Sequence, residues 1–314
     1  MASVLVFIDV PGLPLPRASR ELLTIARSLG KPAVASPRAL DGEALQALGE
    51  YGVGTVYEPA DALPDVLVAA KAAFLADAVR AEDPAAVLLG NSFEDREVAA
   101  RVGVKLSSGV ITDAVAVAPD LSVTKSVLAG SYTSTCRVQN GVPVITVKAN
   151  SVEPVPADAP SVPESRRITV SDAGPAARVT GRTEKRVSGR PELSEARVIV
   201  AGGRGMDGDF GPVEDLADVL GGAVGASRAA TDAGWIEHSA QVGQTGKTVS
   251  PQLYISAGIS GAIQQKAGMQ TAKVIVAVNK DADAPVFEIA DFGIVGDVFS
   301  VLPQATEEIR KRRS

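Results

Sequence analysis

The chain has 314 residues, of which 46% are hydrophobic and 22% are charged, so it is long enough for two globular domains. Its net charge of −6 gives no general attraction for nucleic acid, and we interpret the basic residues 310–313 as a solvated helix end rather than a binding patch. A single cysteine, Cys136, excludes an internal disulfide and a cysteine-cluster metal site. The single histidine, His238, has no second histidine to pair with and is interpreted as a loop residue, so we predict no metal site.

The first residues already read as a strand, with no charged leader or Arg-rich presequence before them. No apolar run is long enough to span a membrane. We therefore expect no membrane insertion and a place in the bacterial cytoplasm.

The first half alternates short apolar runs with helical stretches. Strands are predicted at 4–8, 32–35, 55–58 and 86–89, and helices at 18–29, 42–49, 66–81 and 95–103. This alternation predicts a parallel sheet covered on both faces. The β-rich runs 110–117, 122–129, 132–138 and 142–147 follow, separated by turn residues, and they predict an added antiparallel portion.

A change in composition then separates the two halves. Pro154, Pro156, Pro160 and Pro163 punctuate a segment of low apolar content, and one more strand is predicted at 168–170. We expect this segment to cross back over the first domain. The boundary is placed in the polar and basic stretch that follows, giving domains 1–187 and 188–314; the alternative is that the proline-rich segment is itself the boundary.

The second half is again α/β. Strands are predicted at 198–201, 223–227, 254–256, 274–278 and 286–290, and helices at 213–220, 262–267 and 293–301. The fold class expected for the chain is therefore α/β, with two domains that are each built on a largely parallel sheet with helices on both faces.

Glycines and polar residues stand at the ends of the strands in the second half. The strand ends are followed by Gly202-Gly203-Arg204-Gly205, Ser227-Arg228, Gly258-Ile259-Ser260-Gly261 and Asn279-Lys280-Asp281. In a parallel sheet these ends meet at one edge, where ligands bind. Gly258 and Gly261 bracket a tight turn, and Ser260 is placed as the N-cap of a following helix, whose unpaired N–H groups suit an anion.

This set of residues predicts a site for a charged cofactor. It contains no carboxylate pair, no nucleophile with a base and no metal cluster, so we predict no catalytic residues. The loop 241–246 adds further donors.

One alternative is a nicotinamide-binding Rossmann unit, because Gly203, Gly205 and Gly208 match GxGxxG after a strand. However, Pro212 suits the first turn of a helix that starts later than this motif requires. Arg228 also stands where an acidic residue would hold the ribose, so this alternative would need NADP.

A family resemblance is carried by residues 253–279, LYISAGISGAIQQKAGMQTAKVIVAVN. This stretch resembles the signature of the electron-transfer flavoprotein alpha subunit. Two positions depart from that pattern: Ser256 replaces the usual Ala or Thr, and Gln265 replaces a His. GGRG, SRAATDAGW, QVGQTGK and APVFEIADFGIVGD also resemble the family, as does the first half more loosely through LLGNSFEDREVAARVGVKLSSGVITD.

The resemblance implies a Rossmann-like C-terminal domain that binds one FAD noncovalently. Thr245 would lie near flavin N5, Arg228 would lie against the isoalloxazine and favour its reduced form, and Asn279 and Asp297 would contact the adenosine end. The cofactor-binding residues that it implies are Arg204, Ser227, Arg228, Gln241, Val242, Gly243, Gln244, Thr245, Ser260, Gly261, Ala262, Ile263, Gln264, Gln265, Asn279, Asp297 and Val298.

The resemblance also implies an electron carrier and not an enzyme with its own substrate. It would form a heterodimer with a β subunit, take electrons from acyl-CoA dehydrogenase-type donors of fatty acid β-oxidation, and pass them to a quinone reductase of the respiratory chain. The alternatives are an NADP-dependent oxidoreductase and a redox-inactive nucleotide-binding subunit.

The departure at Gln265 carries its own prediction. The family's His is implied to hydrogen-bond the C2 carbonyl region of the flavin, which gains negative charge on reduction. A Gln amide can keep that bond but cannot carry charge, so we expect a flavin that is harder to reduce. The alternative is that Gln265 points away and its backbone N–H alone makes the bond.

Overall fold

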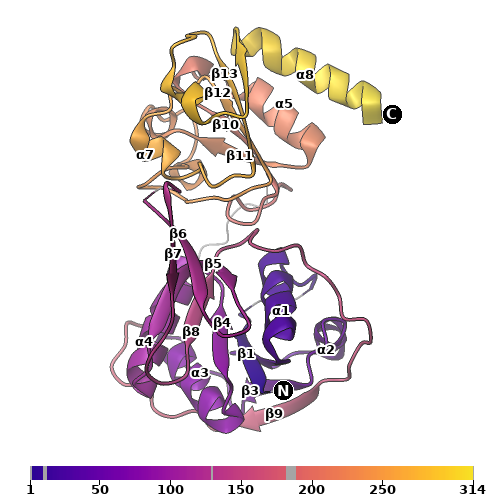
Figure 1. The fold of residues 1–314 in the computed structure, drawn as a ribbon, viewed down its shortest axis with the longest axis vertical. Coiled ribbons are helices and arrows are strands. Elements are labelled where there is room, and N and C mark those ends of the chain that lie inside the picture. Colours follow the sequence, from indigo (N-terminus) through magenta and orange to yellow (C-terminus); the bar gives the residue numbers. More distant parts are fainter. Residues whose placement is uncertain (1, 10–12, 129, 182–188, 314) are drawn as a thin grey trace. The chain divides into compact units, whose positions relative to one another are not determined.

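The computed structural model describes residues 2–9, 13–128, 130–181 and 189–313. The chain divides into two α/β units, Met1–Ser126 with Thr133–Glu184 and Val127–Tyr132 with Lys185–Ser314 (Figure 1). Each unit is built on a largely parallel sheet, which confirms the predicted fold class. The predicted boundary between residues 187 and 188 lies outside the described residues and stays a prediction.

The described part of the first unit forms a nine-stranded sheet in the order β7-β6-β5-β8-β4-β1-β2-β3-β9. From β5 to β9 in this order the strands run parallel, whereas β6 is antiparallel to β5. The strands are β1 (Ser3–Phe7), β2 (Lys31–Ala35), β3 (Thr55–Pro59), β4 (Ala86–Leu89), β5 (Val110–Val117), β6 (Val123–Val127), β7 (Tyr132–Cys136), β8 (Val144–Val147) and β9 (Glu164–Ile168).

The predicted antiparallel portion is confirmed for β5 and β6 but is wrong for 142–147. That run forms β8, which lies parallel between β4 and β5. Every residue of β8 is buried, because a strand inside a parallel sheet is covered on both faces.

Four helices cover the described sheet of the first unit: α1 (Arg17–Leu29), α2 (Gly42–Gly49), α3 (Ala69–Glu82) and α4 (Phe93–Leu106). Alternate residues of β1 face opposite sides. Val4 and Val6 belong to the core under α1 and α2, whereas Leu5 and Phe7 belong to the core under α3 and α4. The sheet therefore has an apolar layer on each face.

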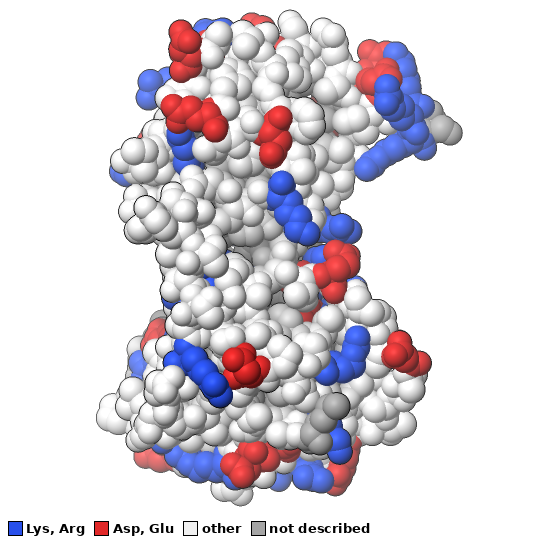
Figure 2. Space-filling model, viewed as in Figure 1, with Lys and Arg blue, Asp and Glu red and all other residues white. Residues whose placement is uncertain are grey.

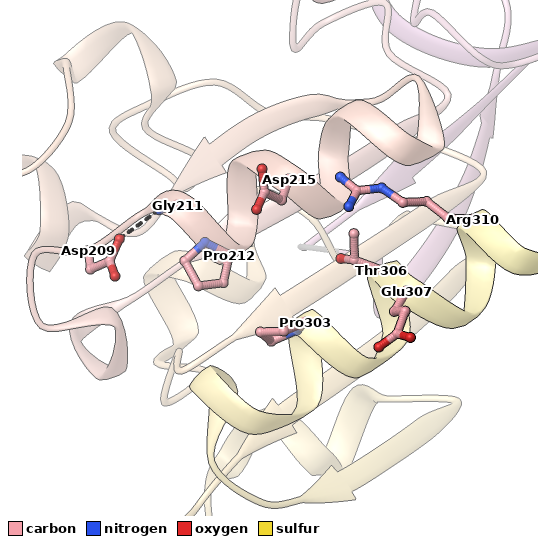
Figure 3. A pocket seen from close by; sticks show the side chains of 8 residues that line it. All are labelled: Asp209, Gly211, Pro212, Asp215, Pro303, Thr306, Glu307 and Arg310. Atoms are coloured by element: carbon pink, nitrogen blue, oxygen red, sulfur yellow. Dashed lines mark hydrogen bonds between the residues drawn. The ribbon is translucent and has the colours of Figure 1, made fainter.

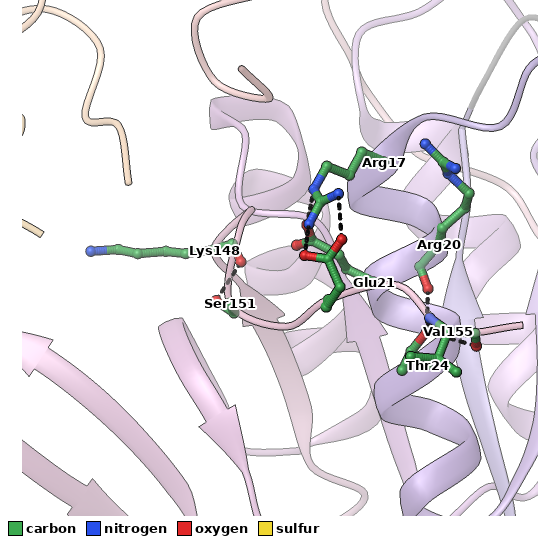
Figure 4. A network of polar contacts seen from close by, with 8 residues as sticks. Arg17, Arg20, Glu21, Thr24, Lys148, Ser151 and Val155 are labelled. Atoms are coloured by element: carbon green, nitrogen blue, oxygen red, sulfur yellow. Dashed lines mark hydrogen bonds and ion pairs between the residues drawn. The ribbon is translucent and has the colours of Figure 1, made fainter. Parts of the chain in front are cut away.

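The proline-rich segment 148–163 crosses the first unit from β8 to β9, as expected. Figure 4 shows its contact with α1, where Thr24 accepts a hydrogen bond from the Val155 N–H at 3.1 Å. The buried carboxylate of Glu21 lies 2.9 Å from Arg17 Nε. Burial raises the pKa of Glu21, although Arg17 and the backbone of the crossing segment oppose the shift. The segment leads into β9, which begins at Glu164. The strand predicted at 168–170 therefore begins four residues earlier than expected.

The second unit has a five-stranded, fully parallel sheet in the order β11-β10-β12-β13-β14 among the described residues. Helices α5 and α8 pack side by side over one face (Figure 1), and α7 lies with the loops over the other. The strands are β10 (Val198–Gly202), β11 (Ala223–Ala226), β12 (Leu253–Ala257), β13 (Val274–Asn279) and β14 (Phe292–Val295). The helices are α5 (Gly211–Leu220), α6 (Arg228–Asp232), α7 (Ile263–Lys266) and α8 (Val298–Arg313), with short 3₁₀ turns η1 (Arg204–Met206), η2 (His238–Ala240) and η3 (Pro285–Ile289).

Two predictions near the C-terminus are wrong. Of residues 286–290, predicted as a strand, the first four fall in η3, which spans Pro285–Ile289, and Ala290 is its C-cap. The strand follows as β14, and α8 therefore starts at Val298 instead of residue 293. A proline fixes φ near the helical value and has no N–H for a ladder, which favours the 3₁₀ turn at this point.

The basic residues at the end of the chain belong to the last turns of α8. Lys311 pairs with Glu307 at 2.7 Å and Arg312 with Glu308 at 2.8 Å, and Figure 2 shows both signs of charge together at this end. Among the described helices, none combines the length and the apolar character that crossing a bilayer requires.

Candidate cofactor-binding site

The strand order of the second unit defines a crevice at its carboxyl edge. From β10 the chain first adds β11 on one side and then β12, β13 and β14 on the other. This reversal makes the carboxyl ends of β10 and β12 a topological switch point, where α/β sheets bind ligands. The register pairs Gly202 of β10 with Ala226 of β11 and Ala257 of β12, so the predicted site residues after these strands start at one level.

The two loops at the switch point pack backbone against backbone. Gly203 N–H donates to the Ala257 carbonyl and Gly205 N–H to the Gly258 carbonyl, both at 2.9 Å. A Cβ on Gly205 would lie 2.8 Å from the Cα of Gly258, whose φ of +61° favours glycine. Side chains are therefore excluded here, and the floor of the crevice is bare backbone.

Six consecutive amides follow this floor without a partner. Within the described chain, no acceptor is found for the N–H groups of residues 259–264. The flanking amides are satisfied, because Gly258 donates to Val278 and Gln265 to Ala262, each at 2.9 Å. Such a run of unpaired donors forms a nest for an anion or a polarised carbonyl.

Four of the six donors, residues 259–262, belong to a loop, and the other two belong to the first turn of the short helix α7. Helix α7 has four residues, and its N-cap is Ala262, which has no side-chain hydrogen bond. The prediction of Ser260 as the N-cap of a helix at 262–267 is therefore wrong. The anion-binding character of this stretch comes from its individual N–H groups, since the dipole of one helical turn is small.

The loop 241–246 is fixed to both neighbouring helices. The buried Gln241 amide accepts from Thr231 at 3.1 Å and donates to Thr245 Oγ1 at 3.0 Å. Gln244 N–H donates to the Gln264 carbonyl at 2.8 Å, which joins the loop to α7. Thr231 was not predicted as a site residue; its place in α6 and in the family-like segment SRAATDAGW could have indicated it.

Two cations lie exposed at the same edge. Arg204 follows β10 in η1, and Arg228 is the first residue of α6 after β11. Arg228 Nε lies 3.2 Å from Asp232 Oδ2, and both side chains are more than half exposed. An exposed pair of this kind contributes about 0.2–1 kcal/mol, so Arg228 can exchange this contact for another anion.

The remaining predicted residues differ in what they can offer. Asn279 donates to the Ile259 carbonyl at 3.0 Å, and Asp297 accepts from Phe299 N–H at 2.7 Å at the start of α8. The side chains of Val242 and Val298 are buried in the two cores, so these residues can offer backbone only. Ser227 is also buried, and its hydroxyl has no partner among the described residues.

Gln265 is turned into the protein. Its Nε2 donates to the hydroxyl of the fully buried Tyr254 at 3.1 Å, while its Oε1 is buried without a partner in the described chain. Burial raises the pKa of Tyr254, and the bond from Gln265 only partly opposes this, so the phenol is neutral. The structure agrees with the first half of the alternative, that the Gln265 side chain points away. It does not agree with the second half, because the Gln265 backbone N–H already donates to the Ala262 carbonyl, and the unpaired amides are those before it. Ser256, the other departure, is buried, and its hydroxyl has no partner in the described part of the chain.

Comparison with known proteins gives the family. Residues 4–173 match the electron transfer flavoprotein domain, and residues 192–270 match the electron transfer flavoprotein FAD-binding domain. The chain is 43% identical over the full length of both chains to the electron transfer flavoprotein subunit alpha of Mycobacterium leprae, and 44% to that of Mycobacterium tuberculosis. It is 36% identical to the subunit alpha of Syntrophomonas wolfei, over 99% of this chain and all of that one. The chain belongs to the electron transfer flavoprotein alpha-subunit family. Its cofactor is FAD.

The edge of the second sheet fits the FAD of an electron transfer flavoprotein. The pyrophosphate of FAD is an anion that needs several donors, and the unpaired amides of 259–264 and the Arg204 guanidinium are donors of the kind that would hold it. The glycines let the two loops pack backbone against backbone, so no side chain of these residues covers the strand ends. FAD supplies reversible redox chemistry when bound, while the protein supplies binding and orientation.

The corresponding edge of the first unit is occupied by the protein's own charges. Its switch point lies between β1 and β4, where Lys71 bridges Asp9, at 2.5 Å, and Glu94. The N-terminus of α4 is closed by a capping box in which Ser92 and Asp95 satisfy each other's backbone N–H. In the described part of this edge we therefore find no exposed run of donors comparable to 259–264.

A second hollow in the electron transfer flavoprotein fold does not suit FAD. A cavity of about 420 Å³ lies in the groove between α5 and α8 (Figure 3). Its charged lining is Asp209, Asp215, Glu307 and Arg310. Three carboxylates against one cation would repel phosphates, and the groove lies between helices instead of at strand ends.

Proposed function

We propose that the chain is an electron carrier that binds one FAD noncovalently at the carboxyl edge of β10–β14 and pairs with a β subunit. Electrons pass to it from acyl-CoA dehydrogenase-type flavoenzymes and leave to a quinone reductase. The chain has no substrate turnover of its own. The same proposal places it in the bacterial cytoplasm and places the domain boundary near residue 187.

The observation that carries the proposal is the run of unpaired amides at the switch point. The edge offers donors and cations, and among its described residues we find no nucleophile held by a base. Such an edge binds an anionic cofactor and leaves the redox chemistry to it.

The residues have the following proposed roles. The amides of 259–264 and Arg204 bind the pyrophosphate, and Thr245, held by Gln241, presents its hydroxyl near flavin N5. Arg228 lies against the isoalloxazine and favours the reduced form, since a cation near a partly dry ring stabilises added negative charge. Asn279 and Asp297 lie at the adenosine end.

Two alternatives are less well supported. For a nicotinamide Rossmann unit, the third glycine of the motif should lie in the helix. Gly208 instead lies in the loop before α5, with a φ of +88° and the Trp235 ring beside it. A redox-inactive nucleotide-binding subunit would bind a nucleotide whose absorbance does not change when a reductant is added.

The test is to identify the cofactor of the heterodimer purified after co-expression with its β subunit. We expect heat to release FAD and the bound chromophore to bleach and recover reversibly. FMN, NADP or no cofactor after reconstitution would reject the proposal. Gly205→Val, which places a side chain against Gly258, should remove FAD, whereas Gly42→Ala should retain it because open space surrounds that position.

A further inference from the structure

The last strand of the second sheet is an uncovered apolar edge. Strand β14 reads Phe-Gly-Ile-Val, and each of its residues is exposed. Phe292 is 65% exposed, Ile294 42% and Val295 60%. Exposed apolar edge strands pair readily with other chains, and proteins normally protect them with charge, bulges or a covering element.

The apolar side chains of β14 stay exposed on both faces, although the Phe287 ring of η3 lies over Gly293. The register places Phe292 beside Val276 and Ile294 beside Val278, on the face where α8 packs. Helix α8 covers β13 but leaves these two side chains exposed, and Phe299 at its start is exposed as well. On the other face, Val295 lies beside Asn279. The apolar surface therefore wraps around the edge of the sheet.

The charges around β14 indicate what can cover it. Residues 280–297 include one basic residue, Lys280, and five acidic residues: Asp281, Asp283, Glu288, Asp291 and Asp297. Glu288 is paired with Lys266 at 2.7 Å, which leaves four carboxylates against Lys280. A second copy of the chain, docked edge to edge, would place these carboxylates against each other. A partner strand with basic residues at its ends would meet opposite charge.

We propose that β14 is the docking edge for an extended apolar segment of the β subunit, flanked by basic residues, which pairs with β14 as an added strand. Main-chain hydrogen bonds to the edge give such an interaction its affinity, and apolar contacts on alternate positions give its specificity. The inference rests on the proposed heterodimer but not on the positions of the FAD contacts.

Hydrogen exchange of the purified heterodimer tests the pairing without any substitution. We expect the amides of 292–296 to exchange at least tenfold more slowly than those of β7, which is also an exposed edge strand but is polar. Exchange of β14 at the rate of β7 would overturn the proposal. Because opposite charges would attract the two subunits, raising the salt concentration should weaken binding of the β subunit. Binding that does not depend on salt would contradict the claim that basic residues flank the partner segment.

A matched pair of variants tests the occupant. Ile294→Lys should weaken binding of the β subunit at least tenfold, whereas Val162→Lys, at a residue that is 94% exposed in the first unit, should not. FAD content and the unfolding midpoint show whether Ile294→Lys is still folded. A folded variant that binds the β subunit as well as the parent would overturn the proposal. Loss of self-association alone would assign the edge to a second copy of the chain.

If the parent binds FAD but forms no heterodimer, the partner part of the proposed function fails together with this inference. If the heterodimer forms without FAD, the cofactor part fails and the inference stands on the exchange result.

Discussion

The hydrogen bond between Gln265 and Tyr254 gives a prediction whose magnitude follows from the structure. Both side chains are buried, and one of the two polar atoms of the Gln265 amide is already unpaired. Tyr254→Phe removes the acceptor and leaves the whole amide unsatisfied at almost no loss of apolar area. An unsatisfied buried group costs about 1–3 kcal/mol, and we expect Tyr254→Phe to lower the free energy of unfolding by this amount.

The partner variant should behave differently. Gln265→Met keeps the size of the side chain and removes the unpaired Oε1, but it leaves the Tyr254 hydroxyl without a donor. We expect a smaller loss than for Tyr254→Phe. The double variant removes all three polar atoms, and we expect it to lie within about 1 kcal/mol of the parent, since replacing both partners by apolar groups is close to neutral.

Urea unfolding of the cofactor-free protein measures this double-mutant cycle. Trp235 is the only tryptophan in the chain and packs against the core under α5 and α8, so its fluorescence follows the second unit. The denaturant slope should stay constant across the four proteins. Losses that simply add in the double variant would refute the reasoning, because they would show that the two side chains do not interact.

Three further outcomes are expected. Arg228→Ala should lower the reduction potential of the flavin, with partial recovery in Arg228→Lys; an unchanged potential at full FAD occupancy would contradict the role of the cation. A fragment 190–314 should bind FAD if it folds, and FAD binding by an equally folded fragment 1–181 would contradict the site. Burial of Asp113 opposes ionisation, but hydrogen bonds, including one from Asn91 at 2.9 Å, outweigh it and hold the pKa of the carboxyl below its ordinary value of 3.8. Ionised Asp113 therefore stabilises the fold above that value, and urea titrations should show a stability loss on acidification that is smaller in Asp113→Asn.

The alternation of strands and helices made most of the fold predictable, and its failures have physical reasons. The run that forms β8 is apolar and β-branched in either orientation, and its parallel place comes from pairing with β4 and β5, which are distant in sequence. Near the C-terminus, the apolar residues after Pro285 read as a strand by composition. Strand β14 itself contains Gly293, which weakens the same pattern.

The backbone part of the site could also be predicted, because glycines and donors after parallel strands must meet at one edge. The direction in which each side chain points could not be predicted from the sequence. The bond from Gln265 to Tyr254 joins positions whose contact depends on how the turn at 258–262 folds, and no local pattern encodes it. For the same reason the anchor that Thr231 provides for Gln241 was missed.

The crossing segment has a consequence for how the first unit is made. Strand β9 pairs with β3, and Ser165 donates to the buried Glu58 at 2.7 Å across 107 residues of sequence. During synthesis, the edge of β3 therefore stays open until residue 168 has left the ribosome. A chain that stops near residue 150 would keep β1 to β8 but would expose the β3 edge and uncover one oxygen of Glu58. Such a nascent or truncated chain exposes the β3 edge to strand pairing with neighbouring nascent chains, so β9 determines when this edge becomes protected.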